Sequence, residues 1–276
     1  MTTEADDPRT PRAELVVADG VATITLRDPK GINAIDGRLA RELRAAFEQA
    51  NERDDVGAIV TLAEGKSWCM GGAVAEFVGL GDGVPDFVRA VGTDLNPLVA
   101  AIHRSPKVTV AGVHGPLAGA GLGLMAAHDL VVADPGTSLS VAYHRLGLTP
   151  DAGVSYFLVR DLGYRRALDF YLGDETMRAD AAFAAGLLSR LSAEGAVHAE
   201  ATALAARHAA GPRSAHATTK RLYRQLGDAT LEEQTADEIR SLADETTTAD
   251  FREGLQAMLE RRAPEFGRAA TGSAAS

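Results

Sequence analysis

The chain has 276 residues, 46% of them hydrophobic, and a formal net charge of −10 at pH 7. This composition is typical of a globular protein, and the negative charge excludes nucleic acid as an expected partner. The single cysteine, Cys69, excludes an internal disulfide and favours a cytoplasmic location. The longest apolar run, 117–127, is shorter than the roughly 18 residues of a membrane span, so we expect neither a membrane anchor nor a signal peptide.

The first half of the chain predicts alternating strands and helices. An Asp19-Gly20 turn should join the first two strands into a hairpin, and Asp36 should cap the first helix. This order favours an α/β layered fold. In chain order, the expected elements are strands at 13–17 and 21–26, a helix at 37–52, a strand at 57–62, a helix at 86–104, strands at 108–113 and 130–133, and a short buried helix at 122–127 between them.

From residue 154 onward the hydrophobic periodicity is helical. We divide the chain into a core over 12–199, a helical C-terminal part over 200–267, and disordered tails over 1–11 and 268–276. The expected C-terminal helices cover 154–161, 164–172, 178–186, 196–209, 212–225, 231–244 and 250–262.

Two loops rich in small residues follow predicted strands. They read Ser67-Trp-Cys-Met-Gly-Gly72 and Gly115-Pro-Leu-Ala-Gly-Ala-Gly121. Glycines at such junctions indicate that something approaches the backbone closely. A helix that starts at the second loop would point free N–H groups at its guest. An anion, or an oxygen that becomes negative during a reaction, is the guest such a loop suits.

The order and spacing of these segments resemble the enoyl-CoA hydratase/isomerase (crotonase) superfamily over about residues 13–267. The matching motifs are the strand at 21–26 followed by Asn33-Ala34, the two glycine loops, and the stretch from Glu253 to Phe266. The resemblance implies a ClpP/crotonase-like ββα-superhelix core with a helical C-terminal trimerisation part. It also implies an acyl-CoA substrate, no permanently bound cofactor, and a homotrimer or dimer of trimers.

In this family two backbone N–H groups stabilise the negative charge on the thioester oxygen as the enolate forms. By position, the resemblance assigns these donors to Met70 and Ala120. Lys220 and Arg262 are weaker candidates for contacts with the phosphates of coenzyme A. The residues that the resemblance places along coenzyme A are Lys30, Ile32 and Ala34, with Cys69, Gly71 and Gly72 of the first loop.

Hydratases of the family use two glutamates, and at their positions this chain has Gly123 and Tyr143. Glycine carries no proton, and a tyrosine with a pKa of about 10 is a poor base near neutral pH. Asp151 remains, in a place where isomerases of the family carry an aspartate. It could instead cap the following helix. Tyr143 is a weak candidate for a direct role, and His144 a weaker one.

The sequence therefore predicts an enoyl-CoA isomerase with Asp151 as its acid/base group. Two alternatives stay open, a hydratase with an atypical site and an acyl-CoA-binding homologue without catalysis. If Asp151 lines the substrate pocket, the isomerase is favoured. If Asp151 only caps a helix, the acyl-CoA-binding homologue without catalysis is favoured. We expect no metal site, no dinucleotide site and no serine nucleophile, because the chain lacks their motifs.

Overall fold

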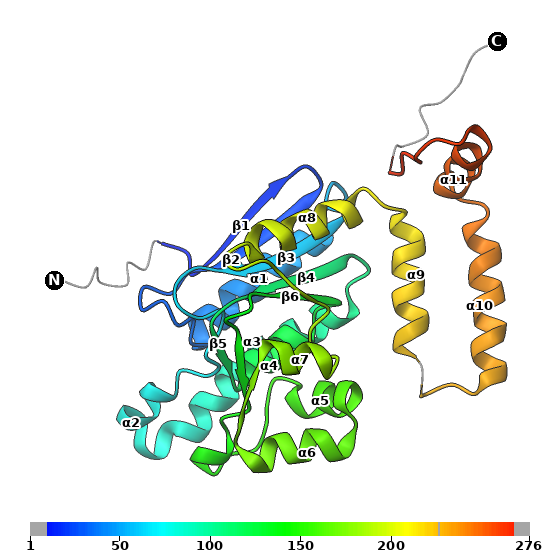
Figure 1. Ribbon diagram of the computed structural model, residues 1–276. Helices are drawn as coiled ribbons and strands as arrows, with labels where there is room; N and C mark the ends of the chain where they lie inside the picture. Colours follow the sequence, from blue (N-terminus) through cyan, green and yellow to red (C-terminus); the bar gives the residue numbers. More distant parts are fainter. Residues whose placement is uncertain (1–9, 226, 268–276) are drawn as a thin grey trace.

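The computed structural model describes residues 10–225 and 227–267, and its centre is a six-stranded sheet (Figure 1). The first two strands pair antiparallel and every other neighbouring pair is parallel. In spatial order the strands are β1 (Ala13–Ala18), β2 (Val21–Leu26), β3 (Ala58–Ala63), β4 (Val108–Val113), β6 (Leu130–Ala133) and β9 (Arg190–Leu191). A smaller sheet joins β5 (Pro116–Ala118), β7 (Ser138–Ser140) and β8 (Thr176–Arg178).

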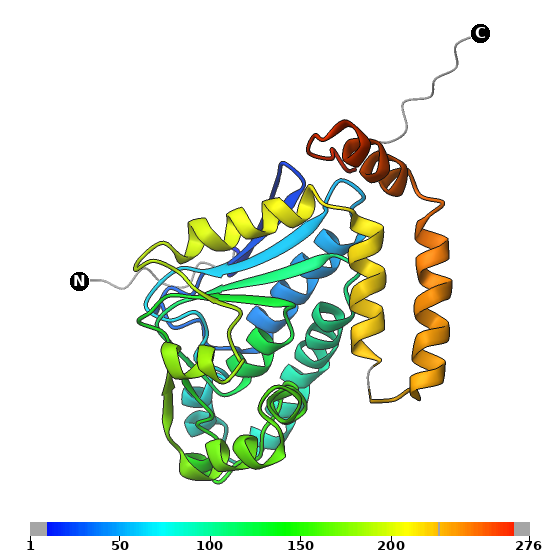
Figure 2. The same cartoon turned by 45° about the vertical axis from the view of Figure 1, so that its right-hand side comes forward.

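Helices cover both faces of the large sheet, which explains why its parallel strands are apolar on both sides. Along β3, Ile59 packs with the larger core cluster, while Val60 packs with a second cluster that includes Leu204. The larger cluster contains residues of α1 (Gly37–Glu52), α3 (Val84–Arg104) and α4 (Ala120–Ala126). The second contains residues of α8 (Val197–Ala209), which lies along the opposite face of the sheet (Figure 2).

Most of the predicted elements are confirmed within one or two residues. The hairpin turn has positive φ at Asp19 (49°) and Gly20 (77°). The Asp36 side chain accepts from the backbone N–H of Leu39 at 2.8 Å and so caps α1. The prediction missed the short strands β5, β7, β8 and β9, because two or three residues are too few for a periodic signal.

Several short elements refine the prediction around the site. Helix α4 begins at Ala120, inside the second glycine loop, and the stretch predicted as a helix over 178–186 is β8 followed by α7 (Ala179–Ala184). The segment before α3 consists of single turns. The remaining elements are η1 (Val74–Glu76), α2 (Phe77–Leu80), η2 (Gly81–Gly83), η3 (His144–Leu146), α5 (Val154–Leu162) and α6 (Tyr164–Gly173).

The C-terminal helices α9 (Arg213–Arg224), α10 (Leu231–Glu245) and α11 (Ala249–Glu260) stand apart from the sheet. Helices α9 and α10 run side by side in both views (Figures 1 and 2). The predicted boundary at residue 200 falls inside α8, whose residues pack against the sheet in the second cluster. The predicted tails fall largely on 1–9 and 268–276, outside the described residues.

A buried histidine joins α4 to the sheet. The Nδ1–H of His128 donates to the carbonyl oxygen of Leu124 and its Nε2 accepts from the Thr61 hydroxyl, each at 2.9 Å. Its ring lies edge-on to Trp68, 6.3 Å between centroids. Burial lowers the pKa of His128 from 6.5 to about 4. This imidazole is therefore neutral in the folded protein at physiological pH.

The depressed pKa of His128 predicts a loss of stability in acid. Above pH 6.5 both states are neutral, but as the pH falls toward 4 the unfolded chain takes up the proton first. This difference removes roughly 3 kcal/mol from the free energy of unfolding across that window. Urea unfolding of His128→Gln should show a correspondingly flatter pH dependence, while exposed His144→Gln should not. An unchanged slope in His128→Gln would contradict this assignment.

Candidate functional site

The two glycine loops lie side by side, with backbone against backbone. Cys69 forms a parallel bridge with Leu117, and the N–H of Ala118 donates to the Cys69 carbonyl at 3.2 Å. A Cβ on Gly71 would come within 2.6 Å of the Ala118 oxygen, and one on Gly121 within 2.5 Å of the Cys69 oxygen. The glycines predicted that some group approaches the backbone closely. In the structure that group is the backbone of the other glycine loop.

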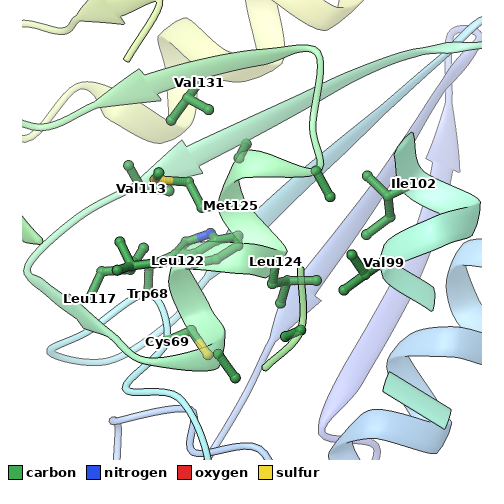
Figure 3. Packing of buried hydrophobic residues seen from close by; sticks show 14 of the residues in the cluster. Trp68, Cys69, Val99, Ile102, Val113, Leu117, Leu122, Leu124, Met125 and Val131 are labelled. Carbon is green, nitrogen blue, oxygen red and sulfur yellow. The ribbon is translucent and has the colours of Figure 1, made fainter. Parts of the chain in front are cut away.

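Both loops pack against the larger hydrophobic core cluster. Trp68 and Cys69 are buried beside Leu122 and Met125 of α4 (Figure 3). Burial raises the pKa of the Cys69 thiol to about 12. Cys69 is therefore a neutral packing residue in the first loop and not a nucleophile, because a nucleophile would need the thiolate.

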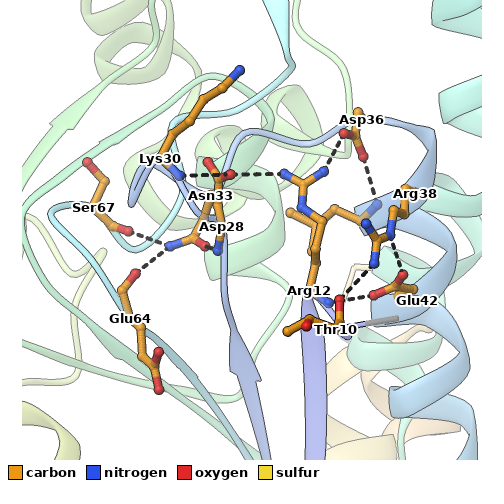
Figure 4. Close-up of polar contacts among 11 residues, drawn as sticks. Thr10, Arg12, Asp28, Lys30, Asn33, Asp36, Arg38, Glu42, Glu64 and Ser67 are labelled. Atoms are coloured by element: carbon orange, nitrogen blue, oxygen red, sulfur yellow. Dashed lines mark hydrogen bonds and ion pairs between the residues drawn. The ribbon is translucent and has the colours of Figure 1, made fainter. Parts of the chain in front are cut away.

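Asn33 fixes the position of the first loop relative to the sheet. Its buried side-chain amide donates to the carbonyl oxygens of Glu64 (2.9 Å) and Ser67 (2.8 Å), and its oxygen accepts from the N–H of Asp28 (2.9 Å) (Figure 4). Asn33 has a φ of 50°, a conformation that asparagine tolerates better than most residues. In the same figure, Arg12 pairs with Asp28 and with Asp36.

The two predicted oxyanion donors differ in the hydrogen bonds that their backbone N–H groups make. Ala120 is the first residue of α4, and its N–H has no acceptor among the described residues. The N–H of Met70 instead donates to the carbonyl oxygen of Ile32 at 3.1 Å. A substrate oxygen would have to replace Ile32 at this amide. The sequence could not reveal this bond because it joins loops that meet only in the folded chain.

The place of the first hydratase glutamate is closed. A Cβ at Gly123 would lie 2.0 Å from the carbonyl oxygen of Ala152, so the loop after Asp151 packs directly on the backbone of α4. Ala152 (φ 49°) and Gly153 (φ 78°) both adopt the left-handed conformation to make this contact. The chain therefore lacks the glutamate and also the space for one.

Asp151 does not cap a helix. The N-cap of α5 is Gly153, and no side chain accepts from the first turn of that helix. The Tyr143 hydroxyl donates to the Asp151 carboxylate at 2.5 Å. Burial, and next the charge of Asp151, raise the pKa of Tyr143 well above its ordinary value, so this hydroxyl keeps its proton. Tyr143 and Asp151 thus form a pair in which tyrosine donates and aspartate accepts.

Asp151 lines two neighbouring cavities. The first, about 480 Å³, also touches Gly72 and Ala73 of the first loop and the apolar face of α3, including Val91 and Leu95. The second, about 650 Å³, extends from Asp151 between α3 and α5. A group bound at the glycine loops can therefore reach the carboxylate from the first cavity.

The predicted contacts of coenzyme A lie at the surface beside the first loop. Lys30 is exposed, Ile32 is 36% exposed and Ala34 is partly exposed. The two weaker candidates for phosphate contacts form ion pairs within the chain: the Lys220 side chain is mostly buried against Asp129, and Arg262 pairs with Glu253 and Glu260. Both side chains are already neutralised by these partners.

His144 is exposed and packs edge-on against Tyr171, 6.0 Å between ring centroids. It lines neither cavity at Asp151, so the structure gives it no part in the site. No group of three or more metal-ligating side chains converges within residues 10–225 and 227–267. Over the same residues, no helix is both long and apolar enough to cross a membrane.

Comparison with known proteins assigns the family. The family model described as enoyl-CoA hydratase/isomerase matches residues 17–269. The chain belongs to this family. A Rhodobacter capsulatus protein named "Probable enoyl-CoA hydratase" is 34% identical over 253 residues, covering 91% of this chain and 95% of the relative. An Arthrobacter protein named 4-chlorobenzoyl coenzyme A dehalogenase-1 is 30% identical, covering 86% of each chain.

The fold is the crotonase fold. The crystal structure of an enoyl-CoA hydratase from Polaromonas sp. JS666 superimposes with a TM-score of 0.87 at 26% identity, covering 92% of this chain and 98% of that one. The protein is thus an acyl-CoA enzyme of the hydratase/isomerase family. Since the names of its relatives include different reactions, the reaction of this chain has to be argued from its own residues.

The contact at Gly123 predicts intolerance to any side chain there. Gly123→Ala should lower the free energy of unfolding by about 2 kcal/mol and displace the Asp151 loop, because the new Cβ overlaps the Ala152 carbonyl. Gly123→Glu should not create a hydratase. Gly79→Ala, where nothing lies within 4 Å, is the matched control. Urea unfolding and a crotonyl-CoA hydration assay measure both effects; a stable Gly123→Glu enzyme that hydrates crotonyl-CoA would contradict the prediction.

Proposed function

We propose that this protein is an enoyl-CoA isomerase in which Asp151 is the single acid/base group. The observation that carries the proposal is the position of the Asp151 carboxylate, held by Tyr143 and lining the cavity that also touches the first glycine loop. A carboxylate that only capped α5 would have favoured a binding protein without catalysis.

In the proposed reaction the thioester oxygen of a 3-enoyl-CoA accepts from the N–H of Ala120. The N–H of Met70 becomes the second donor once the substrate replaces the Ile32 carbonyl. Asp151 removes a proton from C2, the negative charge spreads onto the thioester oxygen, and the protonated Asp151 returns the proton to C4. The product is the conjugated 2-enoyl-CoA, and no resident cofactor is needed.

Tyr143 orients the base in this proposal. Its hydroxyl donates a hydrogen bond to one oxygen of the carboxylate. Because the pKa of Tyr143 is raised, the hydroxyl keeps its own proton while Asp151 carries the substrate proton from C2 to C4. Hydration would need a second group to activate water, and the closed space at Gly123 argues against one at the usual position. We also propose a cytoplasmic location, in keeping with the single buried cysteine.

The central prediction concerns Asp151 and Tyr143. Asp151→Asn should lower kcat for the double-bond shift about 10²- to 10⁴-fold, because it removes the acid/base group. Tyr143→Phe should lower kcat about tenfold with little change in KM, because it removes one hydrogen bond to the charged base. His144→Gln, on the neighbouring residue, is the control and should keep wild-type kinetics. Stopped-assay conversion of 3-hexenoyl-CoA to 2-hexenoyl-CoA measures all three.

Two further substrates separate the alternatives in the same assay. If wild type hydrates 2-hexenoyl-CoA faster than it isomerises 3-hexenoyl-CoA, the atypical hydratase replaces the proposal. If it releases chloride from 4-chlorobenzoyl-CoA, a dehalogenase replaces the proposal, the activity in the name of one of its relatives. If no substrate reacts while acyl-CoA binds, the protein is a binding homologue.

We further propose that α10 and α11 mediate assembly into trimers. Leu231 (74%), Met258 (66%) and Leu259 (69%) are apolar and exposed on these helices, as expected for faces covered in an oligomer. Light scattering coupled to size exclusion should give three times the mass of the chain, or six times for a dimer of trimers. Met258→Glu with Leu259→Glu should lower that mass, whereas Val78→Glu, at a more exposed position on α2, should not. A monomeric wild type would refute this proposal.

A further inference from the structure

The second cavity at Asp151 has a negative and a positive end. Asp151 and Asn96 line it at the side shared with the first cavity. Its walls then become apolar, with Val99 and Phe157, and Arg104 lines it further along α3. Asn96 and Arg104 are eight residues apart on this helix, which corresponds to about 12 Å at the rise of an α-helix. The cavity therefore offers a path leading away from the acid/base group.

Basic side chains gather at the far end. Arg104 of α3 and Arg224 of α9 line the cavity, and so does His103 of α3. The guanidinium of Arg160 stacks over the ring of Tyr156, another lining residue, 5.1 Å from its centroid. Burial, and next the charges of Arg224 and Arg160, lower the pKa of His103, as expected where positive groups converge on one ring.

The nearby carboxylates do not balance these charges. Asp129 lies 3.5 Å from Arg224, but it also forms a shorter ion pair with Lys220. Asp161 lines the adjoining cavity and not this one. The Arg104 side chain is exposed and forms no hydrogen bond or ion pair with another described residue. In a chain of net charge −10, this local excess of positive charge is a specific feature.

We propose that the far end of this cavity binds a carboxylate on the acyl group, so that the preferred substrates are enoyl-CoA thioesters of dicarboxylic acids. The reaction itself rests on the function proposed above. The apolar walls would hold the methylene chain and the guanidinium groups would pair with the terminal carboxylate. Asp151 would repel that carboxylate from the near end, so the acyl group binds in one direction only. An uncharged chain of the same length would leave the guanidinium groups without a partner.

The test compares two substrates that differ only in the terminal group, 3-octenoyl-CoA and 3-octenedioyl-CoA. Wild type should show a kcat/KM about tenfold higher for the dicarboxylic substrate, the effect of one charge-assisted hydrogen bond. Arg104→Gln with Arg224→Gln should abolish this ratio. Arg165→Gln with Arg166→Gln, at two exposed arginines of α6 that line neither cavity, makes the same change in charge and should preserve it. The ratio should also shrink as the ionic strength rises.

A binding measurement separates this proposal from the proposed reaction. In Asp151→Asn, calorimetry with the saturated thioesters octanoyl-CoA and octanedioyl-CoA needs no turnover, and the second should bind about tenfold more tightly. Because Arg224 also contacts Asp129, Arg104→Gln alone serves as a second variant, at an exposed side chain without a partner among the described residues, and should reduce the preference. Equal affinity for the two thioesters, or a preference that survives the double substitution, would overturn the proposal whether or not the isomerase activity is found.

Discussion

The site depends on backbone contacts that only glycine permits. Gly71 and Gly121 let the two loops pack against each other, and Gly123 lets the loop after Asp151 pack on α4. A Cβ at any of these three positions would come within 2.6 Å of a backbone oxygen. Because backbone cannot move aside as a flexible side chain can, these contacts set the distance between the N–H of Ala120 and the Tyr143–Asp151 pair.

The Tyr143–Asp151 pair also depends on strained backbone. Ala142 (φ 61°) precedes Tyr143, and Ala152 (φ 49°) follows Asp151, and both are left-handed residues without the freedom of glycine. Such conformations cost free energy and persist where the surrounding packing determines them. Here each one turns the neighbouring side chain so that the tyrosine hydroxyl meets the carboxylate. Strain next to both members of the pair is consistent with a functional role for it.

Charge is distributed unevenly around this centre. The chain is acidic overall, yet Arg104 and Arg224 line the cavity beyond Asp151, and Arg160 stacks over the ring of a third lining residue, Tyr156. Lys220 and Arg262, the basic residues that looked available for phosphates, are instead paired with acidic neighbours. A basic residue that lines a cavity and lacks an acidic partner indicates the charge of the ligand. The number of basic residues in the sequence does not, because many of them are paired with acidic residues.

The sequence alone determined the order of strands and helices, the turn at Asp19-Gly20, the cap at Asp36 and the place of both glycine loops. These features follow from signals within a few residues, such as periodicity and turn chemistry. It also determined the family, and that both hydratase glutamates are missing. Only the tertiary structure decided three contacts. The Tyr143 hydroxyl donates to the Asp151 carboxylate, and the N–H of Met70 donates to the carbonyl oxygen of Ile32. The carbonyl oxygen of Ala152 lies where a side chain at Gly123 would be. Each of these contacts joins segments that are separate along the chain, so it depends on how the layers pack and not on any local pattern.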